Sequence, residues 1–413
     1  MMQRASFSSV HIPAIDGLRA LAVIAVVLYH LGITWIPGGF LGVDLFFVIS
    51  GYVITRLILD SIESANGLDI REFYAARTRR LFPGLLVMLV VTSILIAISS
   101  PDAVRRYVSD LPFVLSGTNN WYLVSLHQDY FQAIGRPPLL QHTWSLAVEF
   151  QFYLIWPVVL LLIWRRFGKK TVRRAALLIA TFSGVALFAF SVSADNATAG
   201  RISHIYFGTD THSLGLFLGA ALAVSWIPRN LTPNISQRAQ DFIDGIGVFG
   251  FLGLLCIFLF IEETNATLYQ IAFPLAAIFG CATLVSIVHP ASRFSPILSH
   301  KILLWIGQRS YGIYLWHWVV FQITRPGADL TGNPIALNIA RVLVVLILAD
   351  ISLRAIEIPI RNRVVQNWFR GIRYRTKVMQ RRQRIFVSSI LVITILTTGG
   401  SIATAWQRDQ SLL

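Results

Sequence analysis

The stretch "IDGLRALAVIAVVLYHLG" (residues 15–32) is apolar enough for a membrane-spanning helix, yet it carries Arg19 and His30. At 3.6 residues per turn, the eleven residues between them place both side chains on one helix face, about 16 Å apart along the axis. An ionisable side chain inside a bilayer is costly and usually marks a functional site in the bundle interior. The alternatives are a snorkelling arginine and a packed histidine with satisfied hydrogen bonds.

Composition extends this prediction to the whole chain. Of 413 residues, 55% are hydrophobic and only 13% are charged, which is typical of a polytopic membrane protein. Eleven apolar stretches are each about 18–24 residues long, enough to cross a bilayer. They lie near 15–36, 40–59, 81–99, 142–164, 175–194, 203–226, 241–261, 268–288, 302–322, 335–356 and 385–406. We therefore predict an all-α, polytopic bundle of about 10–11 spanning helices.

The formal charge of +15 is concentrated in three loops, after the second, fourth and tenth of these stretches. All three fall on one side of the membrane, and the opposite loops carry few basic residues. The positive-inside rule then places the amino terminus in the cytoplasm and the carboxyl terminus outside. This distribution accounts for most of the charge, so we expect the lipid bilayer as a partner and no nucleic acid.

The second apolar stretch, "GGFLGVDLFFVISGYVITRL" (residues 38–57), contains Asp44. Gly38 and Gly39 predict a tight turn before it. If the first two helices are antiparallel neighbours, Asp44 and His30 lie at similar depth. A carboxylate beside an imidazole fixes its tautomer and raises its basicity, so we predict that Asp44 orients His30 as a base. The alternative is a helix-start aspartate near the interface.

Two further stretches place polar groups in apolar helices. In "LLQHTWSLAVEFQFY" (139–153), helical spacing puts His142, Ser145 and Glu149 on one face. Glu149 then needs a partner, which His142, Arg309 or the His30 site could supply. In "GQRSYGIYLWHW" (307–318), Arg309 and His317 lie towards opposite ends of a span. A purely structural polar network is the alternative for both stretches.

Several of these motifs occur in order over most of the chain. They are the Arg-x10-His pair, "GGFLGVDLFFVISGY", "RTRRLFP", "HTWSLAVEFQFYLIWP" and "SYGIYLWHW". Together they resemble the acyltransferase-3 family of bacterial inner-membrane proteins that O-acylate sugars of surface polysaccharides, such as the O-antigen acetylases of lipopolysaccharide. The resemblance implies an acyltransferase for groups other than amino-acyl groups. It would move an acyl group, usually acetyl, from cytoplasmic acyl-CoA to a carbohydrate hydroxyl outside.

The resemblance also implies that Arg19 and His30 are functional and that Arg77 and Arg80 lie near the donor. The spacing agrees, because residues three apart share a helix face and guanidinium groups suit phosphate. We expect His30 to take the acceptor proton or to carry the acyl group briefly, with Asp44 and Glu149 as further catalytic residues. The expected substrate contacts are His142, Trp144, Arg309 and His317. Acetyl-CoA or another acyl-CoA is the expected donor, and no Cys/His cluster predicts a metal site.

We expect residues 1–384 to form the acyltransferase-3-like membrane domain and 385–413 to form one more helix with a short external tail. No SGNH hydrolase-type domain is expected in this sequence. The membrane part could then transfer the acyl group directly or use a separate external acyltransferase partner, or the chain could be truncated. A proton-coupled transporter or flippase is the alternative function. Transporters of that kind commonly show repeated halves, and no repeat is evident here.

Overall fold

A computed structural model describes residues 11–65, 67–131, 135–192, 199–263, 268–371 and 376–410. It confirms the predicted all-α, polytopic architecture. Eight helical segments of the described chain are long and apolar enough to cross a membrane. They are Pro13–His30, Gly39–Ile62, Ile70–Ser99, Gln141–Phe167, Lys169–Val192, Gln237–Phe260, Leu268–Val288 and Pro334–Arg361. The protein is therefore a multi-pass membrane protein.

The three other predicted spans have different outcomes. The stretch 203–226 is broken into three short helices, α8 (Ala199–Phe207), α9 (Thr209–His212) and α10 (Leu214–Ser225). Gly208 begins the first break with an extended backbone, at ψ 131°. The stretches 302–322 and 385–406 lie in α14 (Lys301–Ile323) and α18 (Lys377–Gln410), which are long helices but are not among the eight.

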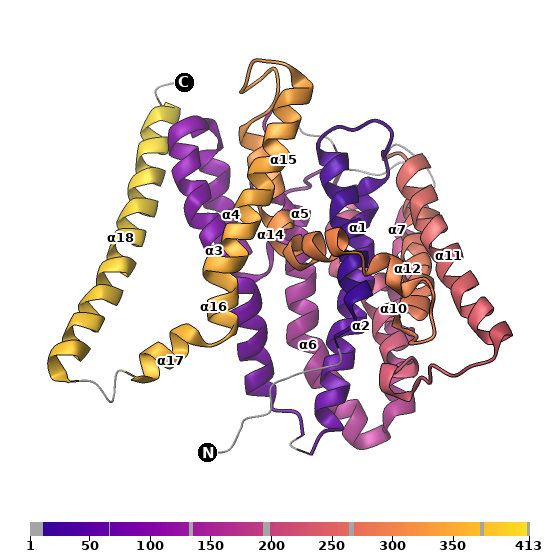
Figure 1. Cartoon of the computed structure of the whole chain (residues 1–413). Helices are drawn as coiled ribbons and strands as arrows, with labels where there is room; N and C mark the ends of the chain where they lie inside the picture. Colours follow the sequence, from indigo (N-terminus) through magenta and orange to yellow (C-terminus); the bar gives the residue numbers. More distant parts are fainter. Residues whose placement is uncertain are drawn as a thin grey trace. The chain divides into compact units, whose positions relative to one another are not determined.

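The chain forms two compact units that alternate along the sequence. The first comprises residues 1–73, 113–133 and 143–310, and the second comprises 74–112, 134–142 and 311–413. Figure 1 labels the helices of both. We describe each unit by itself.

The centre of the first unit is α2 (Gly42–Ile62), which packs against α1 (Pro13–His30) and α10. The glycines around residue 40 permit this approach. A Cβ atom on Gly39 or Gly42 would collide with the backbone of α1, at Ala25 and Ala22. The tight turn predicted at Gly38 does not require glycine, because its φ of −87° is ordinary. Close packing of helices is therefore what these glycines provide.

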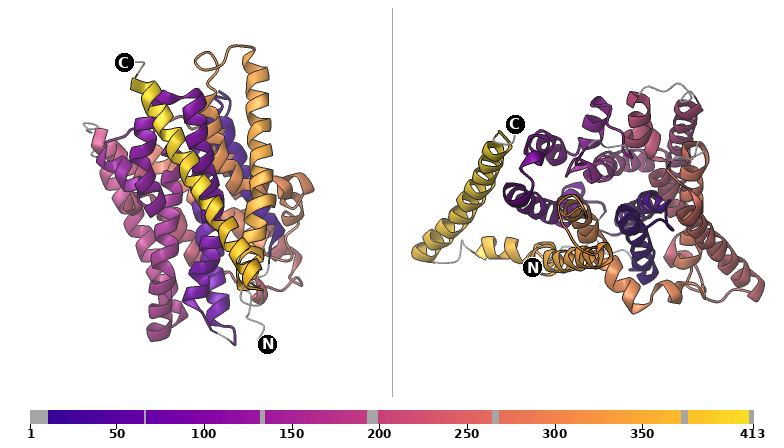
Figure 2. Two further views of the ribbon diagram at one scale, coloured as in Figure 1. Left: turned by 90° about the vertical axis from the view of Figure 1, so that its left-hand side faces the viewer. Right: turned by 90° about the horizontal axis from the view of Figure 1, so that it is seen from above.

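Around this centre lie α5 (Asn119–Ser125), α6 (Trp144–Phe167), α7 (Lys169–Val192), α11 (Gln237–Phe260), α12 (Phe273–Val288) and α13 (Ser295–Leu298). Helix α11 packs against α12, and Figure 2 shows this region from two further directions. Phe182 and Phe188 of α7 and Phe242 and Phe249 of α11 are exposed. Large apolar side chains on the outer surface suit contact with lipid.

The second unit contains most of α3 (Ile70–Ser99) and of α4 (Val104–Ser116), and the second half of α14. It continues through α15 (Pro334–Ile351), α16 (Ile358–Arg361), α17 (Val364–Arg370) and α18. Arg373 and Arg375, which belong to the basic loop after the tenth predicted stretch, lie outside the described residues.

The carboxyl end of α18 is tied to the turn between α3 and α4. The Arg105 Nε donates to an Asp409 carboxylate oxygen at 2.6 Å, and Arg408 donates to the Ile98 carbonyl at 3.1 Å. These contacts place the end of α18 on the same side of the second unit as that turn.

Candidate active site

His30 is the last residue of α1, where the helix leaves the apolar region. Its Nε2 lies 2.9 Å from the hydroxyl of Tyr130, which follows α5. Burial raises the pKa of Tyr130, so this phenol stays protonated and can donate to the imidazole. The preceding Tyr29 donates to a carboxylate oxygen of Glu263. The end of α1 thus brings an imidazole and two phenols together.

Asp44 contacts an imidazole, but not the predicted one. Its Oδ1 lies 3.1 Å from Nε2 of His212, and both residues are buried, with 6% and 4% of their surface exposed. Residue 212 ends α9, the short helix created by the break at Gly208. The predicted pairing of Asp44 with His30 is therefore corrected: His212 takes the carboxylate and His30 lies beside Tyr130. Asp210, the other acid of this stretch, pairs with His204 at 3.0 Å.

A buried aromatic cluster joins these two histidines. Tyr130 stacks on Tyr206 with ring centroids 4.2 Å apart, and Tyr206 lies 5.5 Å from the His212 ring. Trp144 contacts Tyr206 at 5.0 Å and His212 at 5.1 Å. The rings come from the loop after α5, the start of α6, and α8. We call this cluster of His30, Asp44, Tyr130, Trp144, Tyr206 and His212 the aromatic chamber. Its polar groups could exchange protons in surroundings that exclude water.

Glu149 of α6 finds its partner on α2. Ser50 Oγ donates to its Oε1 at 2.5 Å, and the Tyr153 hydroxyl donates to Ser50 at 3.3 Å. The predicted face shared with His142 does not form, because α6 begins at Trp144 and His142 lies in the preceding 3₁₀ turn (Gln141–Thr143). The helical periodicity of this stretch therefore starts two residues later than expected.

Two of the predicted arginines lie in the first unit. Arg19 lies on the same face of α1 as His30, and its Nη1 is 3.9 Å from a carboxylate oxygen of Asp16. Arg309 is 6% exposed, and its guanidinium lies 4.1 Å from the centre of the Trp305 ring and donates to the Trp305 carbonyl at 2.9 Å.

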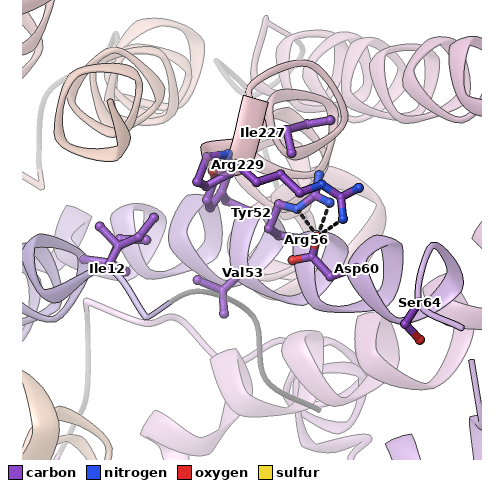
Figure 3. A pocket seen from close by; sticks show the side chains of 10 residues that line it. Ile12, Tyr52, Val53, Arg56, Asp60, Ser64, Ile227 and Arg229 are labelled. Carbon is purple, nitrogen blue, oxygen red and sulfur yellow. Dashed lines mark hydrogen bonds and ion pairs between the residues drawn. The ribbon is translucent and has the colours of Figure 1, made fainter. Parts of the chain in front are cut away.

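A cavity of about 260 Å³ lies between the start of α1, α2 and the segment after α10 (Figure 3). Its apolar wall includes Ile12, Ile15 and Val53, and Arg56, Asp60 and Arg229 supply its charge. The Arg56 Nε donates to Asp60 at 3.1 Å, and Arg229 lies 3.8 Å from the same carboxylate. The sequence analysis missed this cluster, although an arginine inside an apolar stretch with an aspartate four residues later is the signal for a buried ion pair.

Arg77 and Arg80 lie on α3 in the second unit. Both side chains are half-buried. The positive charge of Arg80 interacts favourably with the carboxyl group of Glu357. Their shared helix face is as predicted from the spacing.

His142 and His317 form a buried pair in the second unit. Their rings are 6.0 Å apart, and Trp318 stacks on His142 at 6.2 Å. The His317 Nδ1 lies 2.6 Å from the Tyr314 carbonyl, and the Tyr314 hydroxyl donates to the His142 carbonyl at 2.9 Å. Backbone oxygens and aromatic rings thus surround this pair.

The sequence by itself assigned no role to Tyr130, Tyr206 or His212. Tyrosines in aromatic-rich stretches carry no periodic signal that separates a site from a core. For His212, the signal was an imidazole within a predicted span that also held Gly208 and Asp210.

The described residues form a bundle of apolar helices that buries histidines and carboxylates, the architecture of a multi-pass membrane protein. The family model for an acyltransferase domain matches residues 12–352. The chain therefore belongs to the acyltransferase-3 family.

Two relatives show how far the similarity extends. Peptidoglycan O-acetyltransferase OatA of Listeria monocytogenes is 36% identical over 407 residues, which is 97% of this chain and 65% of that protein. O-acetyltransferase OatA of Staphylococcus aureus is 34% identical over 391 residues, 94% of this chain and 62% of that protein. The chain thus spans slightly less than two thirds of these relatives. No solved structure matches it.

Proposed function

We propose that this protein is a membrane O-acetyltransferase that moves an acetyl group from acetyl-CoA to a hydroxyl of a cell-wall carbohydrate. The observation that carries the proposal is the 36% identity to a peptidoglycan O-acetyltransferase along nearly the whole chain. Because that relative is named for peptidoglycan, we propose peptidoglycan as the acceptor in place of the O-antigen expected from the sequence. The acyl donor and the cytoplasmic side of its entry belong to the same proposal.

For the donor, we propose that Arg77 and Arg80 bind the phosphates of coenzyme A from the cytoplasm. Guanidinium groups bind phosphate oxygens bidentately, and the two side chains share one face of α3. Arg19 would contact the donor nearer the reacting carbonyl, because it shares a face of α1 with His30.

For the chemistry, we propose His30 as a catalytic residue, in either of the two roles expected from the sequence. The 2.9 Å contact to Tyr130 supports this, because it holds the ring in one orientation. Glu149, which accepts a hydrogen bond from Ser50, would be a catalytic carboxyl group in addition to Asp44. An alcohol is a poor nucleophile at neutral pH, and a positioned base typically speeds such a step by about 10²–10⁴-fold.

For the cellular setting, we propose the bacterial cytoplasmic membrane, with residues 1–384 as the acyltransferase domain and 385–413 as an added helix. The contacts of Arg105 and Arg408 support an external carboxyl terminus, because the α3–α4 turn is expected outside. A separate external acyltransferase partner would be able to receive the group there.

The test uses purified full-length protein in lipid nanodiscs with isotopically labelled acetyl-CoA and a soluble peptidoglycan fragment. We expect mass spectrometry to detect labelled O-acetyl ester on the fragment and free coenzyme A in equal amounts. A transporter or flippase would move its cargo without releasing coenzyme A. The proposal is wrong if the protein neither binds nor consumes acetyl-CoA.

A further inference from the structure

The His212–Asp44 pair has the arrangement of a base rather than that of a structural ion pair. The Nε2 of His212 lies 3.1 Å from the Asp44 carboxylate, and neither ring nitrogen of His212 has a hydrogen-bond partner of good geometry among the described residues. The ring is 96% buried, between Phe47 at 5.7 Å and Phe273 at 4.7 Å. A buried polar atom without a partner destabilises the folded protein. Packing alone would favour an apolar residue here.

A second buried nitrogen in contact with this ring also lacks a partner. Trp144 is fully buried, and its Nε1 makes no hydrogen bond within the described part of the chain. The Trp144 and His212 rings are 5.1 Å apart. Two such atoms on adjacent rings of the aromatic chamber indicate a polar ligand that satisfies both.

The protonation pattern defines what that ligand offers. If the neutral imidazole carries its proton on Nε2, the nitrogen nearer Asp44, its lone pair lies on Nδ1, which can then accept a proton. The indole N–H can only donate. A ligand that satisfies both atoms therefore presents one hydrogen-bond donor to His212 and one acceptor to Trp144.

We propose that His212, oriented by Asp44, is the general base for the acceptor hydroxyl, and that Trp144 Nε1–H donates to the acyl oxygen. The hydroxyl oxygen forms a bond to the acyl carbon while its proton passes to His212 Nδ1. The carbon–sulfur bond to coenzyme A then breaks, and the proton is passed on to the departing thiolate. This inference rests on the proposed function but replaces both roles given there to His30: His212 takes the acceptor proton, no acyl group is carried on His30, and His30, which shares a helix face with Arg19, acts on the donor side.

The test compares two acceptors with acetyl-CoA as the donor, using full-length protein in nanodiscs. The first is a peptidoglycan fragment, whose hydroxyl needs a base. The second is hydroxylamine, which is uncharged at neutral pH and attacks without one. For His212→Gln we expect a loss of about 100-fold or more with the fragment. Acetohydroxamate formation above the protein-free blank should stay near the wild-type rate.

The matched control is His204→Gln, because His204 also pairs with an aspartate, at 3.0 Å, but lies outside the aromatic chamber. It should leave both rates near wild type. Asp44→Asn keeps the shape of the site and should lose about tenfold with the fragment, because the tautomer is no longer enforced. Coenzyme A binding by calorimetry verifies that each variant is folded.

Equal losses with both acceptors in His212→Gln would indicate a structural role and overturn the inference, as would unchanged transfer to the fragment. Wild-type protein that makes no acetohydroxamate above the blank would also overturn it, because the chamber would then admit no acceptor-side nucleophile. Failure of the proposed function looks different: wild-type protein would release no coenzyme A with either acceptor.

Discussion

Each unit holds buried or half-buried histidines, but the two units give them different partners. In the first unit, His30 meets a phenol at 2.9 Å and His212 meets a carboxylate at 3.1 Å. In the second unit, His317 meets the Tyr314 carbonyl at 2.6 Å, and the His142 ring lies against Trp318. A titratable partner can exchange or polarise a proton, whereas a backbone carbonyl only holds one tautomer in place.

From this difference we infer that the histidines of the first unit take part in the reaction and that those of the second unit stabilise the fold. In the loops of the second unit, Arg136 and Arg325 both bond Asp329. Its helical interior holds histidines in aromatic surroundings. We therefore expect substitutions in the aromatic chamber to change rates, and those at the His142–His317 pair to change stability.

The largest effect is expected for His30→Ala. It should lower acetyl transfer by about 100-fold or more, because a positioned acid–base group contributes at least this much. Coenzyme A affinity and protein level should stay close to wild type, as measured by calorimetry and quantitative blotting. Near-normal acetylation would show that His30 is a packing residue. It would also contradict the inference that the histidines of the first unit, unlike those of the second, take part in the reaction. If the alanine variant does not accumulate, His30→Gln replaces it.

The next effect concerns donor binding. The double variant Arg77→Ala/Arg80→Ala should weaken coenzyme A binding by about 2–4 kcal/mol, because each charged hydrogen bond contributes about 1.5–3 kcal/mol and the two are not fully additive. Titration calorimetry measures this directly. Arg71→Ala on the same helix is the control, since its side chain is exposed. Unchanged affinity in the double variant would show that both arginines only set the orientation of the protein in the membrane and do not bind coenzyme A.

A smaller effect, with a defined pH dependence, is expected at Asp329. Burial alone would raise the pKa of Asp329, but hydrogen bonds from Arg325 and Arg136 outweigh it and hold the pKa below its usual value. The charged form is therefore stabilised in the folded state. This contribution is present above the unfolded pKa and is lost as the pH falls through the folded one.

Asp329→Asn should thus cost about 1–3 kcal/mol of stability at pH 7. The difference in melting temperature from wild type should shrink as the pH falls below about 4. Thermal unfolding in detergent at several pH values measures it. A difference that stays constant with pH would mean that packing, and not charge, accounts for the loss.

The smallest effect is expected for His317→Leu. Loss of the bond to the Tyr314 carbonyl should cost about 1 kcal/mol of stability. Acetyl transfer should remain close to wild type, since a loss of 1 kcal/mol lowers the ratio of folded to unfolded protein only about fivefold and leaves nearly all of the protein folded. A transfer loss as large as that of His30→Ala would show that both histidine pairs serve the chemistry.

The location of the aromatic chamber could be predicted only in part. His30 and Asp44 stand out because an ionisable residue in an apolar stretch is costly and so must be explained. Their partners do not stand out, because Asp44 and His212 are far apart in sequence and meet only where α2 packs on the broken stretch 203–226. Glu149 similarly pairs with Ser50 of another helix. Helical periodicity gives a side chain's face but not which neighbour that face meets.

The sequence by itself determined the all-α class, most of the membrane-spanning helices and the family, because apolar length and ordered motifs are local properties of the chain. Only the tertiary structure decided which imidazole Asp44 contacts, and that glycines such as Gly39 and Gly42 serve close helix packing. The physical reason is that helix rotation, and the break at Gly208, set the position of each side chain in three dimensions. Within one helix, a shift of a single residue turns a side chain by about 100°, since 3.6 residues make a full turn.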